Sequence, residues 1–461
     1  LPAIRRCAKQ YFRFRLYPLR FYIYTVFARY FGNKEAYISM SEKKERFDFP
    51  RYEYACLNPA YIPASVAVSA EQGGGVSRLS VKPGDSVFEG QTIATGYKTS
   101  VSVHAPIPGI VTGIAERTMP NGEKAECAII DFKGSFNFEG KPAADSAGYS
   151  RSSSHKLISQ IRQYGIINTF DASNGSLAWQ MEQSAGREPA LGVRLFDFDP
   201  SCFVDDFISS HFIDEVLQGA CLCASAINAR TIVFFYSASD FTLPEKEKRD
   251  EFLKSFECRF IKIDTRFYPS GSERVLQRKG SPISLFIDSR TAFSVFKCVS
   301  SGMPLTDTVV EVNGQALHES KMFKVKLGTP IRRLIEECGG CEKAPAKIVI
   351  NGLIKGKAVS DLDIPVTKYV KTVTLLSPGD IPDQTVSPCI HCGFCRTSCP
   401  LNIQPDLIYS HRVNHTPLSQ DVLLSAHLCD KCALCNASCP ARLPLYQTVS
   451  LYKEKDNATN V

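Results

Sequence analysis

Apolar residues follow a helical pattern and a strand pattern in turn between residues 157 and 300. Leu157 to Tyr164 has the apolar spacing of a short helix, and Phe207 to Ala226 repeats apolar residues three and four positions apart. Thr231 to Tyr236 is a run of β-branched and aromatic residues, which is typical of a buried strand. Because helices and strands alternate, this stretch predicts an α/β layer with a partly parallel sheet.

Residues 61 to 133 instead show short apolar runs separated by turn residues such as KPGD at 82–85. The pattern resembles the barrel-sandwich hybrid fold of biotinyl and lipoyl carriers. Those carriers attach their cofactor to a lysine at the tip of the second hairpin, but the comparable segment here, 103–106, reads VHAP. We therefore expect the shared fold without the swinging-arm chemistry, and we expect His104 to be structural.

Residues 303 to 377 read as a small β-rich unit with one helix, Ile331 to Cys338, which ends at Gly339. The end of this helix carries the sequence Cys-Gly-Gly-Cys, from Cys338 to Cys341. A redox-active dithiol is favoured at the N-terminus of a helix, where the dipole stabilises a thiolate, and this pair lies at the opposite end. We therefore expect both thiols to be structural.

Net charge separates the first 39 residues from the rest. The chain carries +7, and residues 1–39 hold eight basic residues and one acid, which leaves the remainder formally neutral. That balance predicts no nucleic-acid partner, because proteins that bind nucleic acids present a basic surface on the folded body. The basic, aromatic segment is either an interfacial membrane anchor or a disordered or non-native start, and its lack of a helical period favours the second. No run of 18 uncharged apolar residues occurs, so we expect any membrane association to be peripheral.

Eight of the eighteen cysteines form two runs with the same spacing, C-x2-C-x2-C-x3-C-P, at 389–400 and 429–440. This spacing binds [4Fe–4S] clusters in bacterial-type ferredoxins, in which the fourth cysteine of each run binds the other cluster. Structural zinc sites usually show two CxxC pairs instead, so the iron–sulfur interpretation is favoured. We predict two [4Fe–4S] clusters and no catalytic residue, with one cluster held by Cys389, Cys392, Cys395 and Cys439 and the other by Cys429, Cys432, Cys435 and Cys399.

The surroundings of these runs carry further expectations. Pro400 and Pro440 are expected to start the helices that follow, and residues 401–428 predict two helices between the runs. The remaining ten cysteines are expected to be buried apolar residues, namely Cys7, Cys56, Cys127, Cys202, Cys221, Cys223, Cys258, Cys298, Cys338 and Cys341.

The order of these units resembles the C subunit of the Rnf electron-transport complex. The likeness spans residues 60 to 455 and rests on GDSVFEGQ (84–91), SVHAPIPG (102–109), YPSGSE (268–273), DIPVTKYV (363–370) and both cysteine runs. It implies a multidomain α/β and α+β chain. The expected segments are a basic aromatic extension (1–39), a barrel-sandwich hybrid domain (40–135), a Rossmann-like α/β domain like that of the complex I flavin subunit (136–300), a β-grasp domain of the SLBB type (301–378) and a two-cluster ferredoxin-type helical domain (379–461).

One part of the resemblance fails. The family's α/β domain implies FMN and NADH, with a loop of the form GxGGAGFP around the flavin phosphate, because only glycine lets backbone amides approach so closely. Residues 164–175 read YGIINTFDASNG, so the paired glycines are missing and Asp171 adds negative charge. The family's acidic NGAECEP segment is replaced by LFDFDPSCFVDD at 195–206. We favour loss of the FMN and NADH sites, although a divergent loop that still binds them stays open.

The resemblance implies a peripheral electron-transfer subunit on the cytoplasmic face of the inner membrane. Its partners would be Rnf-like membrane subunits coupled to Na⁺ or H⁺ translocation and a soluble donor or acceptor, namely NADH, ferredoxin or flavodoxin. Whether the chain is itself an enzyme stays open, because its own NADH-oxidising site is expected to be lost. The alternative is a structural or assembly subunit in which the clusters stabilise a docking domain and no nucleotide is oxidised.

Overall fold

The computed structural model describes residues 49–459 apart from 73–74, 76, 137–152, 172–174, 185–188, 238–252, 266–267, 281 and 382–384. These residues belong to one compact unit, Arg46–Val461. The predicted basic extension, 1–39, and Cys7 lie outside the described residues. Within the described ranges, no helix combines the length and the apolar character that a membrane crossing requires.

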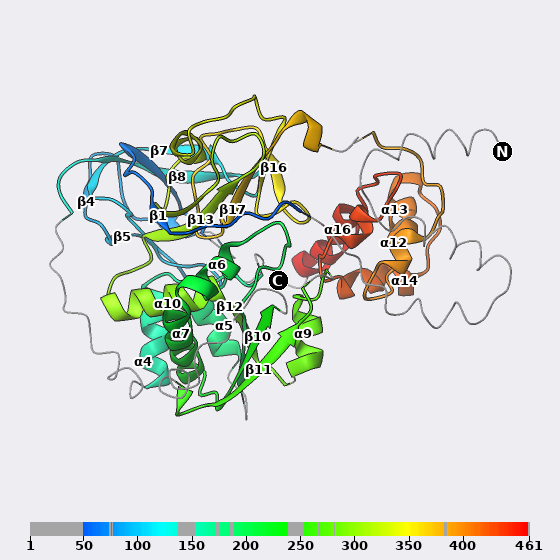
Figure 1. Cartoon of the computed structure of the whole chain (residues 1–461), viewed down its shortest axis with the longest axis horizontal. Coiled ribbons are helices and arrows are strands. Elements are labelled where there is room, and N and C mark those ends of the chain that lie inside the picture. The colour runs from blue at the N-terminus through cyan, green and yellow to red at the C-terminus, as the bar shows by residue number, and fades with distance from the viewer. Residues whose placement is uncertain are drawn as a thin grey trace. The chain divides into compact units, whose positions relative to one another are not determined.

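Two small antiparallel sheets enclose the first core (Figure 1). Side chains from both sheets, including Val68, Ile93 and Ile130, are fully buried between them. His104 lies in the same region, and burial lowers its pKa to about 3, so the ring is neutral. One sheet has the order β2-β8-β7-β4 and the other β3-β5-β6, with bounds β2 Ser65–Ser69, β3 Arg78–Leu79, β4 Ser86–Val87, β5 Thr92–Thr95, β6 Val103–His104, β7 Gly109–Thr118 and β8 Lys124–Phe132.

A four-stranded sheet of order β11-β10-β9-β12 forms the α/β part, and all of its pairings are parallel. The helix predicted from Phe207 to Ala226 is interrupted at Phe212, whose φ of −132° and ψ of 40° separate α6 from α7. The elements are α4 Ser154–Gln163, α5 Leu177–Gln183, β9 Ala190–Arg194, α6 Val204–His211, α7 Ile213–Ala226, β10 Thr231–Ser237, β11 Glu257–Ile263, α9 Glu273–Gly280, β12 Leu285–Asp288 and α10 Ser289–Ser301.

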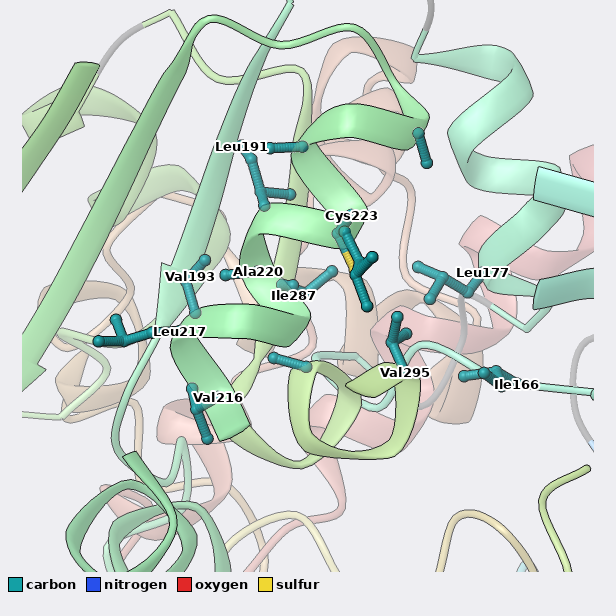
Figure 2. Packing of buried hydrophobic residues seen from close by; sticks show 14 of the residues in the cluster. Ile166, Leu177, Leu191, Val193, Val216, Leu217, Ala220, Cys223, Ile287 and Val295 are labelled. Atoms are coloured by element: carbon teal, nitrogen blue, oxygen red, sulfur yellow. The ribbon is translucent and has the colours of Figure 1, made fainter. Parts of the chain in front are cut away.

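Helix α7 packs against this sheet and against α10 (Figure 2). Leu217 and Ala220 of α7 meet Leu191 and Val193 of β9 in a fully buried core. The two helices approach closely at Gly219, where a Cβ atom would lie 1.9 Å from the carbonyl oxygen of Ala292. Strands β9, β10 and β12 are buried on both faces, which explains their nearly continuous apolar character, whereas the edge strand β11 is partly exposed.

A six-stranded mixed sheet of order β1-β14-β13-β17-β15-β16 follows, with α11 packed on it. Its strand β1 (Asn58–Pro59) comes from the predicted 40–135 segment and pairs in parallel with β14. The predicted helix is confirmed as α11, Ile331–Glu337, and Gly339 beyond it has a φ of +82°. The remaining elements are β13 Asp307–Asn313, β14 Lys321–Lys326, β15 Lys347–Ile350, β16 Lys357–Val359, β17 Thr372–Leu376 and the 3₁₀ helix η3 Pro378–Asp380.

Buried charges join the mixed sheet to the α/β part. Lys371 forms ion pairs with Asp205 and with Asp288, whose carboxylates are fully buried. Burial opposes ionisation of Asp288, but Lys371 and Arg194 hold its pKa below its usual range. Arg290 is also buried and donates to the carbonyl oxygens of Val370 (2.6 Å) and Lys368 (2.9 Å).

Lys368 links three segments that are far apart in the sequence. Its Nζ donates to the carbonyl oxygens of Ser102 at 2.9 Å and Gly165 at 2.7 Å. The side chain is 1% exposed, and burial lowers its pKa to about 7. Since these bonds connect the barrel-sandwich region, the α/β part and the mixed-sheet segment, Lys368 fixes their junction.

The C-terminal part is helical in the described residues (Figure 1). Both helices predicted between the cysteine runs are present, as α13 and α14. The bounds are α12 Phe394–Thr397, α13 Pro405–Asn414, α14 Gln420–Leu424, η4 Ser425–Leu428, α15 Leu434–Ala437 and α16 Leu445–Thr459.

Candidate metal centres

The two cysteine runs fold in the same way, 40 residues apart. His391 and Lys431 occupy equivalent positions and share a φ of +53°. Gly393 and Ala433, two residues later, are also left-handed, and each precedes a one-turn helix, α12 or α15. Because left-handed residues turn the backbone sharply, three thiols of each run are gathered on one loop.

Each loop is completed by a cysteine from the other run. Site 1 is a small cavity, open to solvent, and its wall contains Cys389, Cys392, Cys395 and Cys439. Site 2 is a similar small cavity, also open to solvent, whose wall contains Cys429, Cys432, Cys435 and Cys399. The structure therefore brings together the two groups of four cysteines that the sequence predicted. Apolar side chains complete both walls, including Leu443 and Leu445 at site 1 and Leu401, Ile403 and Val449 at site 2.

The chemistry of these walls suits iron–sulfur clusters. Four thiols surround each cavity, and in the described part of the chain no three His, Cys, Asp or Glu side chains converge closely enough to hold a single metal ion. Burial raises the pKa of the Cys395 thiol to about 12 and that of Cys432 to about 11. Thiolates at these positions need neighbouring positive charge, which bound iron would supply.

The prediction that Pro400 and Pro440 start helices is wrong. Helix α13 begins at Pro405 and α16 at Leu445, five residues after the respective proline. Asn402 and Arg442 lie between, and each has a φ of +54°. A left-handed residue cannot continue a right-handed helix, so each helix starts only beyond it.

A side chain joins the one-turn helix of each half to the next long helix. Arg396 donates from Nε and a terminal nitrogen to the two carboxylate oxygens of Asp406, at 2.7 and 2.6 Å. At the equivalent positions, Asn436 accepts from the backbone N–H of Tyr446 at 2.7 Å. The short helix is thus connected to the long helix by an ion pair in the first half and by a hydrogen bond to the backbone in the second. Asp406 also contributes to the wall of site 1.

The two sites differ around the second cysteine of each run. At site 1, Ile390 is 64% exposed and Cys392 is exposed. At site 2, Cys432 is buried, and it packs with Leu434 against Tyr268 of the α/β part. Residues 268–273 are one of the motifs that carry the resemblance, but nothing in the sequence indicates that Tyr268 contacts a cysteine run.

The α/β loop that would correspond to a flavin site is held by internal bonds in its described residues. The buried Asn168 donates to the carbonyl oxygen of Phe286 at 2.7 Å. Arg194 donates to the carbonyl oxygens of Phe170, Gly271 and Phe196 at 3.0–3.2 Å, so its guanidinium binds backbone. Nearby, burial, followed by the charges of Asp171 and Asp430, raises the pKa of Glu273. Several acids therefore gather here.

Cysteines outside the two sites divide into two groups. Cys338 is buried, and burial raises its pKa to about 12, as expected for a structural thiol rather than a redox-active one. The expectation that all the other cysteines are buried is wrong for Cys56, which is exposed, and for Cys221, Cys258 and Cys341, which are half-buried. Apolar neighbours cover only part of these last three side chains.

Comparison with known proteins identifies the relatives of this chain. Residues 53–135 match the RnfC barrel sandwich hybrid domain, which confirms the fold expected for this region. The chain is 25% identical over 375 residues to the C subunit of the ion-translocating oxidoreductase complex of Klebsiella pneumoniae (strain 342), an alignment that covers 77% of this chain and 48% of that protein. The chain thus spans about half the length of this curated relative.

Two solved structures of an NAD⁺-reducing [NiFe]-hydrogenase also align. The air-oxidized form gives a TM-score of 0.46 at 13% identity over 68% of this chain and 64% of that chain. The H₂-reduced form gives 0.48 at 12% identity over 68% and 62%. The domain match and the extended sequence similarity together identify this chain as an RnfC-like protein.

Proposed function

We propose that this chain is an electron-transfer subunit of an ion-translocating oxidoreductase complex and that it holds two [4Fe–4S] clusters. The observation that carries the proposal is the grouping of eight cysteines into two four-thiol cavities, each built from both runs. Cys389, Cys392, Cys395 and Cys439 would hold one cluster, and Cys429, Cys432, Cys435 and Cys399 the other. When bound, such clusters accept and donate single electrons.

The residues of the chain give the two sites different roles. Site 1 opens to solvent beside the exposed Ile390 and Cys392, so a protein partner can approach it. Site 2 lies against the α/β part through Cys432 and Leu434. Apolar side chains line part of both walls, and such a hydrophobic shell limits solvent access to a bound cluster and tunes its potential.

We further propose that the FMN and NADH sites of the α/β domain are lost. A phosphate needs backbone N–H groups or basic side chains. In the described residues of this region Arg194 is fully buried and bonded to three carbonyl groups, Arg274 is paired with Asp430, and Asp171 and Glu273 add negative charge. The soluble donor or acceptor would then be a ferredoxin or flavodoxin rather than NADH.

Other Rnf-like membrane subunits are the proposed permanent partners. The likeness to a subunit of an ion-translocating complex supports this assignment. A peripheral position on the cytoplasmic face of the membrane follows from the same proposal. The second candidate function is a structural or assembly role, which the interlocking of the two runs favours, because cluster binding would also stabilise the helical domain.

Anaerobic purification with iron, sulfide and flavin assays tests these proposals. We expect about eight iron atoms per chain, no flavin, and no optical or EPR response to NADH. Reduction of the clusters by ferredoxin or flavodoxin would support electron transfer over the structural role. Zinc in place of iron would refute the cluster assignment, and bound FMN with NADH-driven cluster reduction would refute the loss of the nucleotide site.

A further inference from the structure

A tyrosine and an arginine of the α/β part hold the loop of site 2. The hydroxyl of Tyr268 donates to the backbone carbonyl oxygen of Cys432 at 2.6 Å, and the tyrosine side chain is 4% exposed. The Nε of Arg274 lies 2.6 Å from a carboxylate oxygen of Asp430. Both bonds therefore join residues 268–274 to residues 430–432 of the second run.

Packing reinforces the two polar contacts. The ring of Tyr268 lies 5.2 Å from that of Phe198, centroid to centroid, and packs in one apolar cluster with Cys432, Leu434 and Ile354. The side chain of Asp430 is 16% exposed. The Tyr268 hydroxyl therefore acts in a mostly dry environment, where a hydrogen bond has a stronger electrostatic effect than in water.

The first run supplies an internal comparison. Its loop has the same backbone turn, but Ile390 stands where the second run has Asp430, and Ile390 is 64% exposed. Cys392 is exposed, whereas its equivalent, Cys432, is 9% exposed. The difference between the two halves therefore coincides with the contacts that Tyr268 and Arg274 make.

We propose that Tyr268 and Arg274 are positioning residues that set the reduction potential and the stability of the group in site 2. The inference rests on the proposed function, because it takes that group to be a [4Fe–4S] cluster. Hydrogen bonding and solvent exposure around the cysteine ligands are the levers that tune the potentials of such clusters.

The direction of the effect follows from the geometry. The O–H dipole of Tyr268 directs its positive hydrogen toward the peptide of Cys432. A positive charge near a redox group favours the reduced state, which carries one more negative charge. Removing the hydroxyl should therefore lower the potential of site 2. Removing the hydroxyl also leaves the carbonyl group of Cys432 without this donor, which weakens the attachment of the site 2 loop to the α/β part.

The test uses the full chain, loaded anaerobically with iron and sulfide. Tyr268→Phe keeps the ring and removes the hydroxyl. In an EPR-monitored redox titration, we expect both clusters to be present, the potential of one to fall and that of the other to stay unchanged. We expect Arg274→Ala to speed the loss of one cluster to an iron chelator, and Arg274→Lys to restore part of the wild-type rate because it keeps the charge near Asp430.

Tyr54→Phe is the matched control, because the Tyr54 hydroxyl donates to the buried Glu311 at 2.7 Å, away from both sites. It should leave both potentials unchanged. Iron-loaded Tyr268→Phe with wild-type potentials would overturn the inference and leave the proposed function standing. Equal shifts in Tyr268→Phe and Tyr54→Phe would also overturn it, since loss of any buried hydroxyl would then suffice. Failure of the wild-type chain to hold iron would instead overturn the proposed function itself.

Discussion

Paired cysteine substitutions decide which thiols share a site. Cys395→Ala with Cys439→Ala removes two of the four thiols in the wall of site 1 and leaves all four at site 2. Cys395→Ala with Cys399→Ala removes two cysteines of the same run, but takes one thiol from each site. The structure and a simple run-by-run pairing therefore predict opposite outcomes for the two double variants.

The expected magnitudes follow from the number of complete sites. Wild-type chain should hold about eight iron atoms, and Cys395→Ala/Cys439→Ala about four, with the EPR signal of one reduced [4Fe–4S] cluster. Cys395→Ala/Cys399→Ala retains no complete four-thiol site, so that signal should vanish. The matched control is Cys338→Ala/Cys341→Ala, which removes a CxxC pair outside both sites and should keep about eight iron atoms.

Iron and sulfide assays combined with EPR of the dithionite-reduced protein provide the readout. A reduced four-iron signal that survives in Cys395→Ala/Cys399→Ala and disappears in Cys395→Ala/Cys439→Ala would refute the cross-paired sites. Retention of the intact signals in both variants would show that these cysteines are not ligands.

Three further outcomes are expected. Lys371→Met removes the ion-pair partner of the buried carboxylates of Asp205 and Asp288 and should lower the free energy of unfolding, measured by urea denaturation, by about 3–5 kcal/mol. Lys371→Arg keeps the charge and should lower this free energy by less. Equal effects of the two substitutions would contradict the role of the charge. The pKa of Lys368 in the folded chain, about 7, lies below its value in the unfolded chain, so the unfolded chain binds more protons above pH 7. The free energy of unfolding should therefore rise from pH 7 toward 10. The same dependence of this free energy on pH in Lys368→Met would contradict the role of Lys368. A chelator should remove iron first from the site containing the exposed Cys392, and earlier loss from the other site, followed by EPR, would contradict the asymmetry.

Local sequence determined the features that depend on residues close together in the chain. The spacing within each cysteine run gathers three thiols on one loop, because the intervening residues make one tight turn. The β-branched run of β10 and the apolar period of α11 were similarly readable, since each element buries a face of its own. The break at Phe212 was not readable, because apolar spacing continues across it.

Only the tertiary structure decided what depends on residues far apart. Strand β1 joins a sheet whose partner strand, β14, lies more than 250 residues later, and Lys368 connects three segments through backbone carbonyl groups that carry no sequence signal. The bond from Tyr268 to Cys432 spans 164 residues. The two cysteine runs have the same spacing, so spacing alone made the two sites equivalent. Packing against the α/β part covers Cys432 and leaves its equivalent, Cys392, exposed, because burial is a property of the folded surface and not of the motif.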